Sequence, residues 1–185
     1  MVAKLDDIVW EEVMGKRGQV TRSSAWYVAK PCSCTYQYGG DSWPANLFPP
    51  WMDELCQQIQ QVFKYDAAPN AINFNEYKSG SNSLYWHADD EELFIDKQGN
   101  TTVLSLSVGA TRLFQLLRNG SSENDTMDIE LEDGMFLEMA GKTQLHYKHQ
   151  VPPNKMRGLV GKTRYNLTFR WIHTHAASCE VDDDL

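Results

Sequence analysis

Residues 101–117 read TTVLSLSVGATRLFQLL, and this stretch decides the fold class because it contains two short β-type runs in succession. Similar runs lie on both sides of it, separated by turn dipeptides such as Asn-Gly at 119–120 and Asp-Gly at 133–134. These runs are AINFNEY (71–77), NSLYWHA (82–88), MDIELE (127–132), MFLEMA (135–140) and RYNLTFRWI (164–172). Many short strands of this kind predict a double-sheet jelly roll rather than a parallel α/β sheet.

The segments before residue 71 have a helical pattern instead. Residues 5–14 (LDDIVWEEVM) are predicted to form one helix, and residues 51–63 (WMDELCQQIQQVF) a second one that begins after two prolines. The apolar face of the second helix consists of Met52, Leu55, Ile59, Val62 and Phe63. We therefore expect an α+β fold, mainly β with flanking helices, in one domain over residues 1–176, followed by an acidic, disordered tail at 177–185.

Charged residues are segregated along the chain. The formal net charge of -8 argues against nucleic-acid binding, because phosphate contacts depend largely on Lys and Arg. However, residues 13–40 and 142–170 contain no Asp or Glu, and together they hold 11 of the 17 Lys and Arg residues. A folded surface could thus present a basic cleft, although solvated faces that happen to differ in sign would give the same pattern.

The sequence shows neither a secretory leader nor a membrane span. The first residues, MVAKLDD, lack a basic and apolar leader, and no stretch approaches the run of about 18 apolar residues that a membrane span needs. We therefore expect an intracellular protein in the nucleus or cytoplasm, monomeric and without a membrane partner.

The four cysteines show no regular metal or disulfide spacing. Cys32, Cys34, Cys56 and Cys179 include no C-x-x-C pair. Disulfides are rare in intracellular proteins. We therefore favour reduced thiols that pack in the interior over a zinc site.

The run NSLYWHADDEE (82–92) places His87 and Asp89 two residues apart. On a strand, this spacing puts both side chains on the same face. Together with a distant histidine, His-x-Asp is the usual linear form of the 2-His-1-carboxylate triad, which holds Fe(II) and leaves positions open for a co-substrate and oxygen. The spacing also occurs in ordinary surface pairs, so this interpretation needs support from elsewhere in the chain.

Such support comes from RYNLTFRWI (164–172), in which polar and apolar residues alternate strictly. The polar positions are Arg164, Asn166, Thr168 and Arg170. A half-exposed strand would show the same alternation, but two arginines on one face are unusual. If this face points into the jelly roll, Arg170 offers a planar fork for a carboxylate and Arg164 a second cation, as a diacid co-substrate of an iron enzyme requires.

The order of these motifs resembles the AlkB family of dioxygenases. That order is N-x-Y, H-x-D-D-E, a late His followed by Val-Pro, and R-x-N-L-T-F-R, and the similarity spans residues 13–172. It is greatest to the DNA-repair branch, whose N-terminal part is similar to VMGKRGQVTRSSAWY (13–27). The resemblance implies a catalytic double-stranded β-helix over residues 71–172 and a helical N-terminal part with a nucleotide-recognition lid within residues 1–70.

The resemblance also implies roles for individual residues. Fe(II) would be bound by His87, Asp89 and His149. The distal carboxylate of 2-oxoglutarate would be held by Arg170, and the same co-substrate would contact Asn75, Tyr77, Arg164 and Asn166. Substrate contacts would come from Arg22, Tyr36, Tyr38, Glu91 and Met14. Met14 matches the position of a residue that enters the duplex, whereas Glu91 is equally well explained as a solvated acid and each tyrosine as a core residue.

The implied activity is oxidative demethylation of nucleobases of the 1-methyladenine or 3-methylcytosine type in DNA or RNA. Decarboxylation of 2-oxoglutarate, with molecular oxygen, would be coupled to hydroxylation of the alkyl group and release of formaldehyde. One alternative keeps this iron chemistry but applies it to a protein or a small molecule. Another is a catalytically silent nucleic-acid binding module, which would not need the two histidines, the aspartate and the two arginines together.

Overall fold

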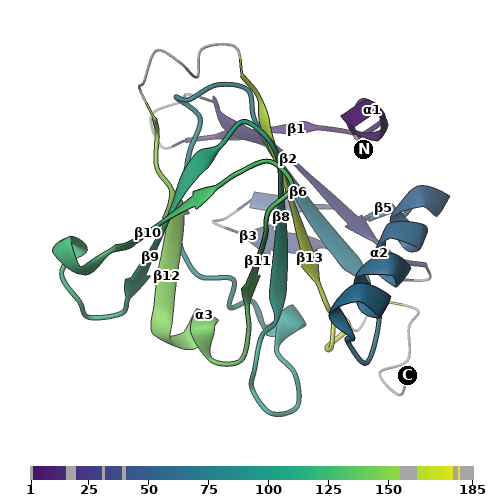
Figure 1. Ribbon diagram of the computed structural model, residues 1–185. Helices are drawn as coiled ribbons and strands as arrows, with labels where there is room; N and C mark the ends of the chain where they lie inside the picture. The colour runs from purple at the N-terminus through teal and green to yellow at the C-terminus, as the bar shows by residue number, and fades with distance from the viewer. Residues whose placement is uncertain are drawn as a thin grey trace.

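The chain forms two facing β-sheets, with a long helix against the outside of the larger one (Figure 1). The structure, a computed structural model, describes residues 2–15, 20–30, 32–38, 41–154, 162–176 and 179. The larger sheet has the order β1-β2-β6-β13-β8-β11, with β5 paired to β2. Its strands are β1 (Glu11–Met14), β2 (Val20–Val28), β5 (Asn46–Leu47), β6 (Ala71–Tyr77), β8 (Val103–Gly109), β11 (Phe136–Met139) and β13 (Arg164–Arg170).

The smaller sheet has the order β10-β9-β12-β7 and is antiparallel throughout. Its strands are β7 (Leu84–His87), β9 (Arg112–Arg118), β10 (Met127–Leu131) and β12 (Tyr147–Val151). From β6 onward the chain passes repeatedly from one sheet to the other. This alternation between two facing sheets is the pattern of a double-sheet jelly roll, as the short β-type runs predict.

Helix α2 (Pro50–Phe63) covers the outer face of the larger sheet. It begins after Pro49 and ends where Lys64 adopts a left-handed conformation, with φ of 59°. Its buried residues Met52, Cys56 and Ile59 belong to the apolar cluster that also contains Ile72, Phe74, Leu104, Leu106, Leu167 and Phe169. The predicted helix is confirmed, but its predicted apolar face is wrong at the C-terminal end, because Val62 is 73% exposed and Phe63 is 38% exposed.

Strand β13 is buried on both faces, which explains its strict alternation. Its apolar residues, including Leu167 and Phe169, pack in the cluster beneath α2. Its polar residues point into the space between the sheets, where Asn166, Thr168 and Arg170 line a cavity. The polar row is therefore an interior surface and not a solvated one.

The predicted helix over residues 5–14 is wrong. Helix α1 spans only Val2–Leu5, and Glu11–Met14 form the edge strand β1. This strand pairs antiparallel with β2, with Val13 opposite Arg22. A ten-residue helix is marginal without packing, and the open edge of β2 offers backbone hydrogen bonds that outweigh its weak intrinsic preference.

Strands β3 (Tyr36–Tyr38) and β4 (Asp41–Trp43) form a separate hairpin beside the larger sheet. Smaller elements are α3 (Thr143–His146) and 3-10 turns at Glu92–Phe94 and Glu123–Asp125. The polar loop predicted at 119–126 does connect β9 to β10. Most of the predicted loop 152–162 and of the predicted tail 177–185 lies outside the described residues.

Among the described residues, no helix is both long and apolar enough to cross a membrane. The predicted division into a lid within residues 1–70 and a catalytic part over 71–172 stays a prediction.

Candidate metal and co-substrate site

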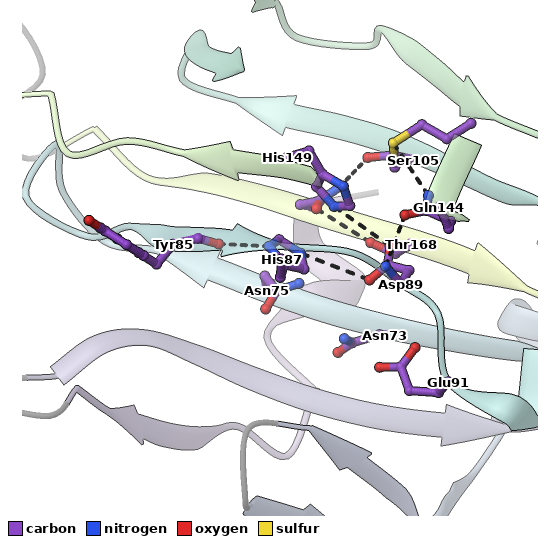
Figure 2. A network of polar contacts seen from close by, with 12 residues as sticks. Asn73, Asn75, Tyr85, His87, Asp89, Glu91, Ser105, Gln144, His149 and Thr168 are labelled. Carbon is purple, nitrogen blue, oxygen red and sulfur yellow. Dashed lines mark hydrogen bonds and ion pairs between the residues drawn. The ribbon is translucent and has the colours of Figure 1, made fainter. Parts of the chain in front are cut away.

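His87, Asp89 and His149 meet between the two sheets (Figure 2). His87 ends β7, Asp89 follows it, and His149 lies directly opposite His87 on β12. The Nε2 atom of His87 lies 3.9 Å from Asp89 Oδ1, and the Nε2 atom of His149 lies 3.8 Å from Asp89 Oδ2. The pairing of β7 with β12 thus brings together a motif and a histidine that are far apart in the sequence.

Neighbouring groups hold the side chain of His87 and the backbone of Asp89. The Nδ1–H of His87 donates to the carbonyl oxygen of Tyr85 at 2.7 Å, and this leaves the Nε2 lone pair directed at the centre of the trio. The backbone N–H of Asp89 donates to Gln144 Oε1 at 2.9 Å. Such supporting hydrogen bonds are typical of metal ligands, because they fix the imidazole tautomer and the ligand orientation.

The protonation states of the three side chains suit a metal ion. Burial lowers the pKa of His149 to about 3 and also lowers the pKa of His87, so both imidazoles are neutral at neutral pH. Burial would raise the pKa of Asp89, but the charge of Arg170 and the hydrogen bond it donates outweigh that effect and hold the pKa below its ordinary value. Two neutral imidazoles and one carboxylate are the donors that Fe(II) takes in a facial triad.

Polar side chains of the larger sheet, together with Tyr36 of β3, line a cavity beside this trio. They are Arg22, Tyr36, Asn73, Asn75, Tyr77, Ser105, Asn166, Thr168 and Arg170. The apolar part of the wall includes Leu84, Phe114, Met139 and Val151. A small interior space with many polar lining residues suits a hydrophilic ligand that is held away from bulk water.

Arg164 is a buried cation whose hydrogen-bonding capacity is largely unused. It is 1% exposed, and its Nη2 donates to Ser107 Oγ at 2.9 Å. Its Nε and Nη1, and the hydroxyl of Tyr77 beneath it, have no hydrogen-bond partner among the described residues. Because a buried and unpaired guanidinium is costly, this arrangement is what a subsite for an anionic group would look like before the anion binds.

Arg170, by contrast, already has anionic partners. Its Nη2 lies 2.8 Å from Asp89 Oδ1, and its Nη1 lies 3.6 Å from Glu91 Oε2 and 3.3 Å from the hydroxyl of Tyr36. The resemblance found in the sequence implies that Arg170 binds the distal carboxylate of the co-substrate. The geometry favours Arg164 for that role, since the fork of Arg170 is engaged by Asp89 at the metal end of the cavity.

Three other predicted co-substrate residues, Asn75, Tyr77 and Asn166, line the same cavity, and Arg164 lies beside Tyr77. Asn75 and Asn166 face each other across the pairing of β6 with β13, as do Tyr77 and Arg164. The Nδ2 of Asn166 donates to Ser105 Oγ at 2.7 Å, which orients this amide in the cavity. The two alternating strands therefore bring all four residues together, as the sequence predicts.

The predicted substrate contacts are less uniform. Arg22 lines the cavity and donates through Nε to Asn75 Oδ1 at 2.6 Å. Tyr36 also lines it, but its ring already packs against Trp26 and Trp43, with centroids 5.0 Å and 5.6 Å away. Its hydroxyl donates to Glu91 Oε1 at 2.8 Å, so Glu91 is a partly buried, bonded acid rather than a solvated one.

The two remaining predicted contacts are Met14, which is not among the residues that line the cavity, and Tyr38. Met14 is 53% exposed on the edge strand β1. The backbone of Tyr38 ends strand β3, and its side chain lies outside the described part of the chain. The roles of both residues stay predictions.

Comparison with known proteins identifies the family of this chain, which carries a candidate metal triad and a buried arginine. The family model of the 2OG-Fe(II) oxygenase superfamily matches residues 6–170. The chain belongs to this superfamily. Iron and 2-oxoglutarate, the cofactor and co-substrate predicted from the motifs, are therefore confirmed at the level of the family, and the donor set of the site fits them.

Relatives within the 2OG-Fe(II) oxygenases carry AlkB names, which confirms the resemblance found in the motifs. The chain is 31% identical over 180 residues to alpha-ketoglutarate-dependent dioxygenase alkB homolog 3 of Mus musculus, covering 90% of this chain and 58% of that protein. It is 30% identical over 171 residues to DNA oxidative demethylase ALKBH2 of Arabidopsis thaliana, covering 79% and 52%. The chain thus spans little more than half the length of these curated relatives.

A solved structure, that of OsALKBH1, has the same fold. It superposes with a TM-score of 0.61 at 18% identity, covering 88% of this chain and 83% of the other. This likeness confirms the predicted jelly-roll fold.

The sequence motifs did not identify two further residues of this site, Asn73 and Gln144. Asn73 continues the alternation of Asn75 and Tyr77 along β6, so the same pattern could have identified it. Gln144, which holds the backbone of Asp89, gives no such signal, because it lies in the four-residue helix α3 far along the chain. Its role depends on tertiary contacts alone.

Proposed function

We propose that this chain is an Fe(II)- and 2-oxoglutarate-dependent dioxygenase that removes alkyl groups from nucleobases in DNA or RNA. The observation that carries the proposal is the metal triad beside a polar-lined interior cavity, with the underused Arg164 packed over the ring of Tyr77, which lines that cavity. The names of the relatives, a dioxygenase and a DNA oxidative demethylase, support the choice of chemistry and substrate class.

We infer that His87, Asp89 and His149 hold the iron, and that Arg164 and the Tyr77 hydroxyl bind the distal carboxylate of 2-oxoglutarate. Together with 2-oxoglutarate and oxygen, bound iron supplies the oxidising chemistry: the products are succinate, carbon dioxide and a hydroxymethylated base, which releases formaldehyde. Arg170 neutralises and orients the Asp89 carboxylate. The apolar wall at Phe114 keeps water from the reacting groups.

The proposed site for the nucleobase is the part of the cavity wall formed by β2 and β3. Arg22 and Tyr36 lie there beside the iron site. Because the ring of Tyr36 is already packed, we propose that this residue shapes the wall and holds Arg170, rather than stacking on the base. We keep the monomeric state and the intracellular location, nuclear or cytoplasmic, as parts of this proposal.

The decisive experiment measures products from defined substrates. Purified chain with Fe(II), ascorbate and 2-oxoglutarate is incubated with oligonucleotides that contain 1-methyladenine or 3-methylcytosine, and repaired base, succinate and formaldehyde are quantified by mass spectrometry. We expect the three products in equal amounts, and none from His87→Ala. Succinate formed without any change in either oligonucleotide, single- or double-stranded, would favour a protein or small-molecule substrate. No succinate under any condition would favour a silent binding module.

A further inference from the structure

A second group of metal-binding side chains lies outside the iron site. Cys32 and Cys34 lie between β2 and β3, and His175 and Cys179 follow β13. One ligand atom from each residue can be chosen so that all four lie within 4.8 Å of one another. The two segments are far apart in the sequence, with 141 positions separating Cys34 from His175. Their meeting is therefore a product of the fold and not of local chain geometry.

The spacing of these atoms matches a tetrahedral zinc site. The Nδ1 of His175 lies 3.6 Å from Cys32 Sγ and 3.5 Å from the Sγ atoms of Cys34 and Cys179. The Sγ atoms of Cys179 and Cys32 are 3.9 Å apart. With Zn–S bonds of about 2.3 Å and Zn–N bonds of about 2.0 Å, neighbouring ligands of a tetrahedral zinc ion lie about 3.5–3.8 Å apart. A disulfide would need about 2.05 Å between two sulfurs.

Backbone N–H groups point at all three sulfurs. Cys32 Sγ accepts from the N–H of Cys34 at 3.4 Å, Cys34 Sγ from Ala176 at 3.4 Å, and Cys179 Sγ from Ser33 at 3.3 Å. A neutral thiol is a weak acceptor, whereas a thiolate attracts such donors strongly. The thiolate is also the form that binds metal, so these peptide groups are placed to support a metal-bound state.

We propose that Cys32, Cys34, His175 and Cys179 bind one structural Zn²⁺ ion. Three thiolates and one imidazole complete a tetrahedral shell and leave no open position, which is the pattern of a structural rather than a catalytic zinc. The ion joins the start of the β3–β4 hairpin to the segment after β13. Spacing in the sequence conceals this site, because the ligands occur as C-x-C and H-x₃-C pairs and not as C-x-x-C.

This zinc ion also stabilises one wall of the oxygenase cavity. The carbonyl oxygen of Cys34 accepts from Trp26 Nε1 at 2.9 Å, and the ring of Trp26 stacks on Tyr36. The hydroxyl of Tyr36 in turn meets Glu91 and Arg170 beside the iron ligands. Loss of zinc is therefore expected to loosen the hairpin and the Tyr36 wall, while the iron ligands on β7 and β12 stay in place.

The test is to measure metal content in the full chain carrying His87→Ala, since zinc can also occupy an iron site and this substitution removes that second location. After expression with added zinc and dialysis against metal-free buffer, we expect about one zinc per chain by inductively coupled plasma mass spectrometry. Replacing zinc with Co²⁺ should give the visible absorption of a tetrahedral thiolate site. Zinc below about one tenth per folded chain, or an intramolecular disulfide between Cys32 and Cys179, would overturn the proposal.

A second test compares the zinc content of a variant that lacks one proposed zinc ligand with that of a control variant. In the same His87→Ala background, Cys179→Ser is expected to lower the zinc content after dialysis by about 10-fold or more, because three ligands hold the ion far less tightly. Cys56→Ser is the control, since this buried cysteine lies in α2 away from the cluster, and it should retain full zinc content. Equal zinc in the two variants would overturn the proposal. If Cys179→Ser does not fold, the Co²⁺ spectrum of the intact cluster decides the question.

Discussion

The roles of the two arginines on β13 can be separated at the level of single residues. Arg164 has two donor nitrogens without a partner among the described residues, whereas Arg170 is bound to Asp89. We predict that Arg164→Lys raises the KM for 2-oxoglutarate about 10- to 100-fold with a smaller change in kcat, because a fork worth about 1.5–3 kcal/mol is lost. Steady-state kinetics of succinate formation measure this split.

Arg170→Lys is the matched variant on the same strand face. It should chiefly weaken iron retention, since lysine cannot hold Asp89, Glu91 and Tyr36 together. A larger increase in KM for Arg170→Lys than for Arg164→Lys would instead mean that Arg170 binds the distal carboxylate of 2-oxoglutarate, as the sequence motif predicts.

Gln144 offers a test of the support behind the metal ligands. Its Oε1 accepts from the backbone N–H of Asp89, and its side chain is buried. Gln144→Met keeps the volume but removes this acceptor, and we predict a loss of about 10- to 100-fold in Fe(II) affinity. Iron titration followed by activity measures the effect. Gln150→Met, which breaks a bond to Gln115 instead, is the control and should leave iron affinity unchanged.

At the scale of strands and helices, the parts that the sequence predicts well are those with two buried faces of different chemistry. Strands β6 and β13 must alternate because one face packs under α2 and the other lines the cavity. Glu11–Met14 carries no comparable pattern, and only the open edge of β2 makes it a strand. The cysteine and histidine cluster also depends on contacts between distant segments, so spacing along the chain does not reveal it.

Strand β7 carries an exposed aromatic ring two residues before His87. Tyr85 is 77% exposed, and its carbonyl oxygen accepts from His87. An exposed ring in this position suits stacking on an unpaired base, so Tyr85→Ala should weaken binding of single-stranded oligonucleotides by about 1–3 kcal/mol. Fluorescence anisotropy measures the affinity. Phe136→Ala is the control, because Phe136 is 40% exposed but packs against Phe63 of α2; an equal loss in both variants would argue against stacking by Tyr85.

Helix α2 and the jelly roll it covers form a scaffold whose stability can be changed without touching the site. Ile59 is 3% exposed beneath the helix, and Ile59→Ala should lower the free energy of unfolding by about 2–5 kcal/mol. Val62→Ala, on the exposed side, should change it by less than about 0.5 kcal/mol. Urea denaturation of the two variants makes the comparison. Similar values would mean that α2 is not docked on the larger sheet as described.

Ligand binding should stabilise the whole molecule, because the two sheets each contribute groups to one cavity. Iron held by His87, Asp89 and His149 would join β7 and β12 of the smaller sheet, and 2-oxoglutarate in the cavity would also meet residues of β6 and β13 in the larger one. With Mn²⁺ in place of iron and 2-oxoglutarate at 100 times its Kd, the gain is about 2.7 kcal/mol, or a rise in Tm of about 5–10 °C for a chain of this size. Differential scanning fluorimetry without oxygen-dependent turnover measures the shift.

The comparison ligand for this experiment is 2-oxobutyrate, which keeps the metal-binding end of 2-oxoglutarate but lacks the distal carboxylate. It cannot pair with the unused nitrogens of Arg164, so its shift should be much smaller. His149→Ala should lose the response to both ligands, whereas Arg164→Lys should lose only the advantage of 2-oxoglutarate. Equal Tm shifts from the two ligands in the unaltered chain would show that Arg164 does not bind the distal carboxylate of 2-oxoglutarate. The co-substrate would then not link the two sheets through Arg164.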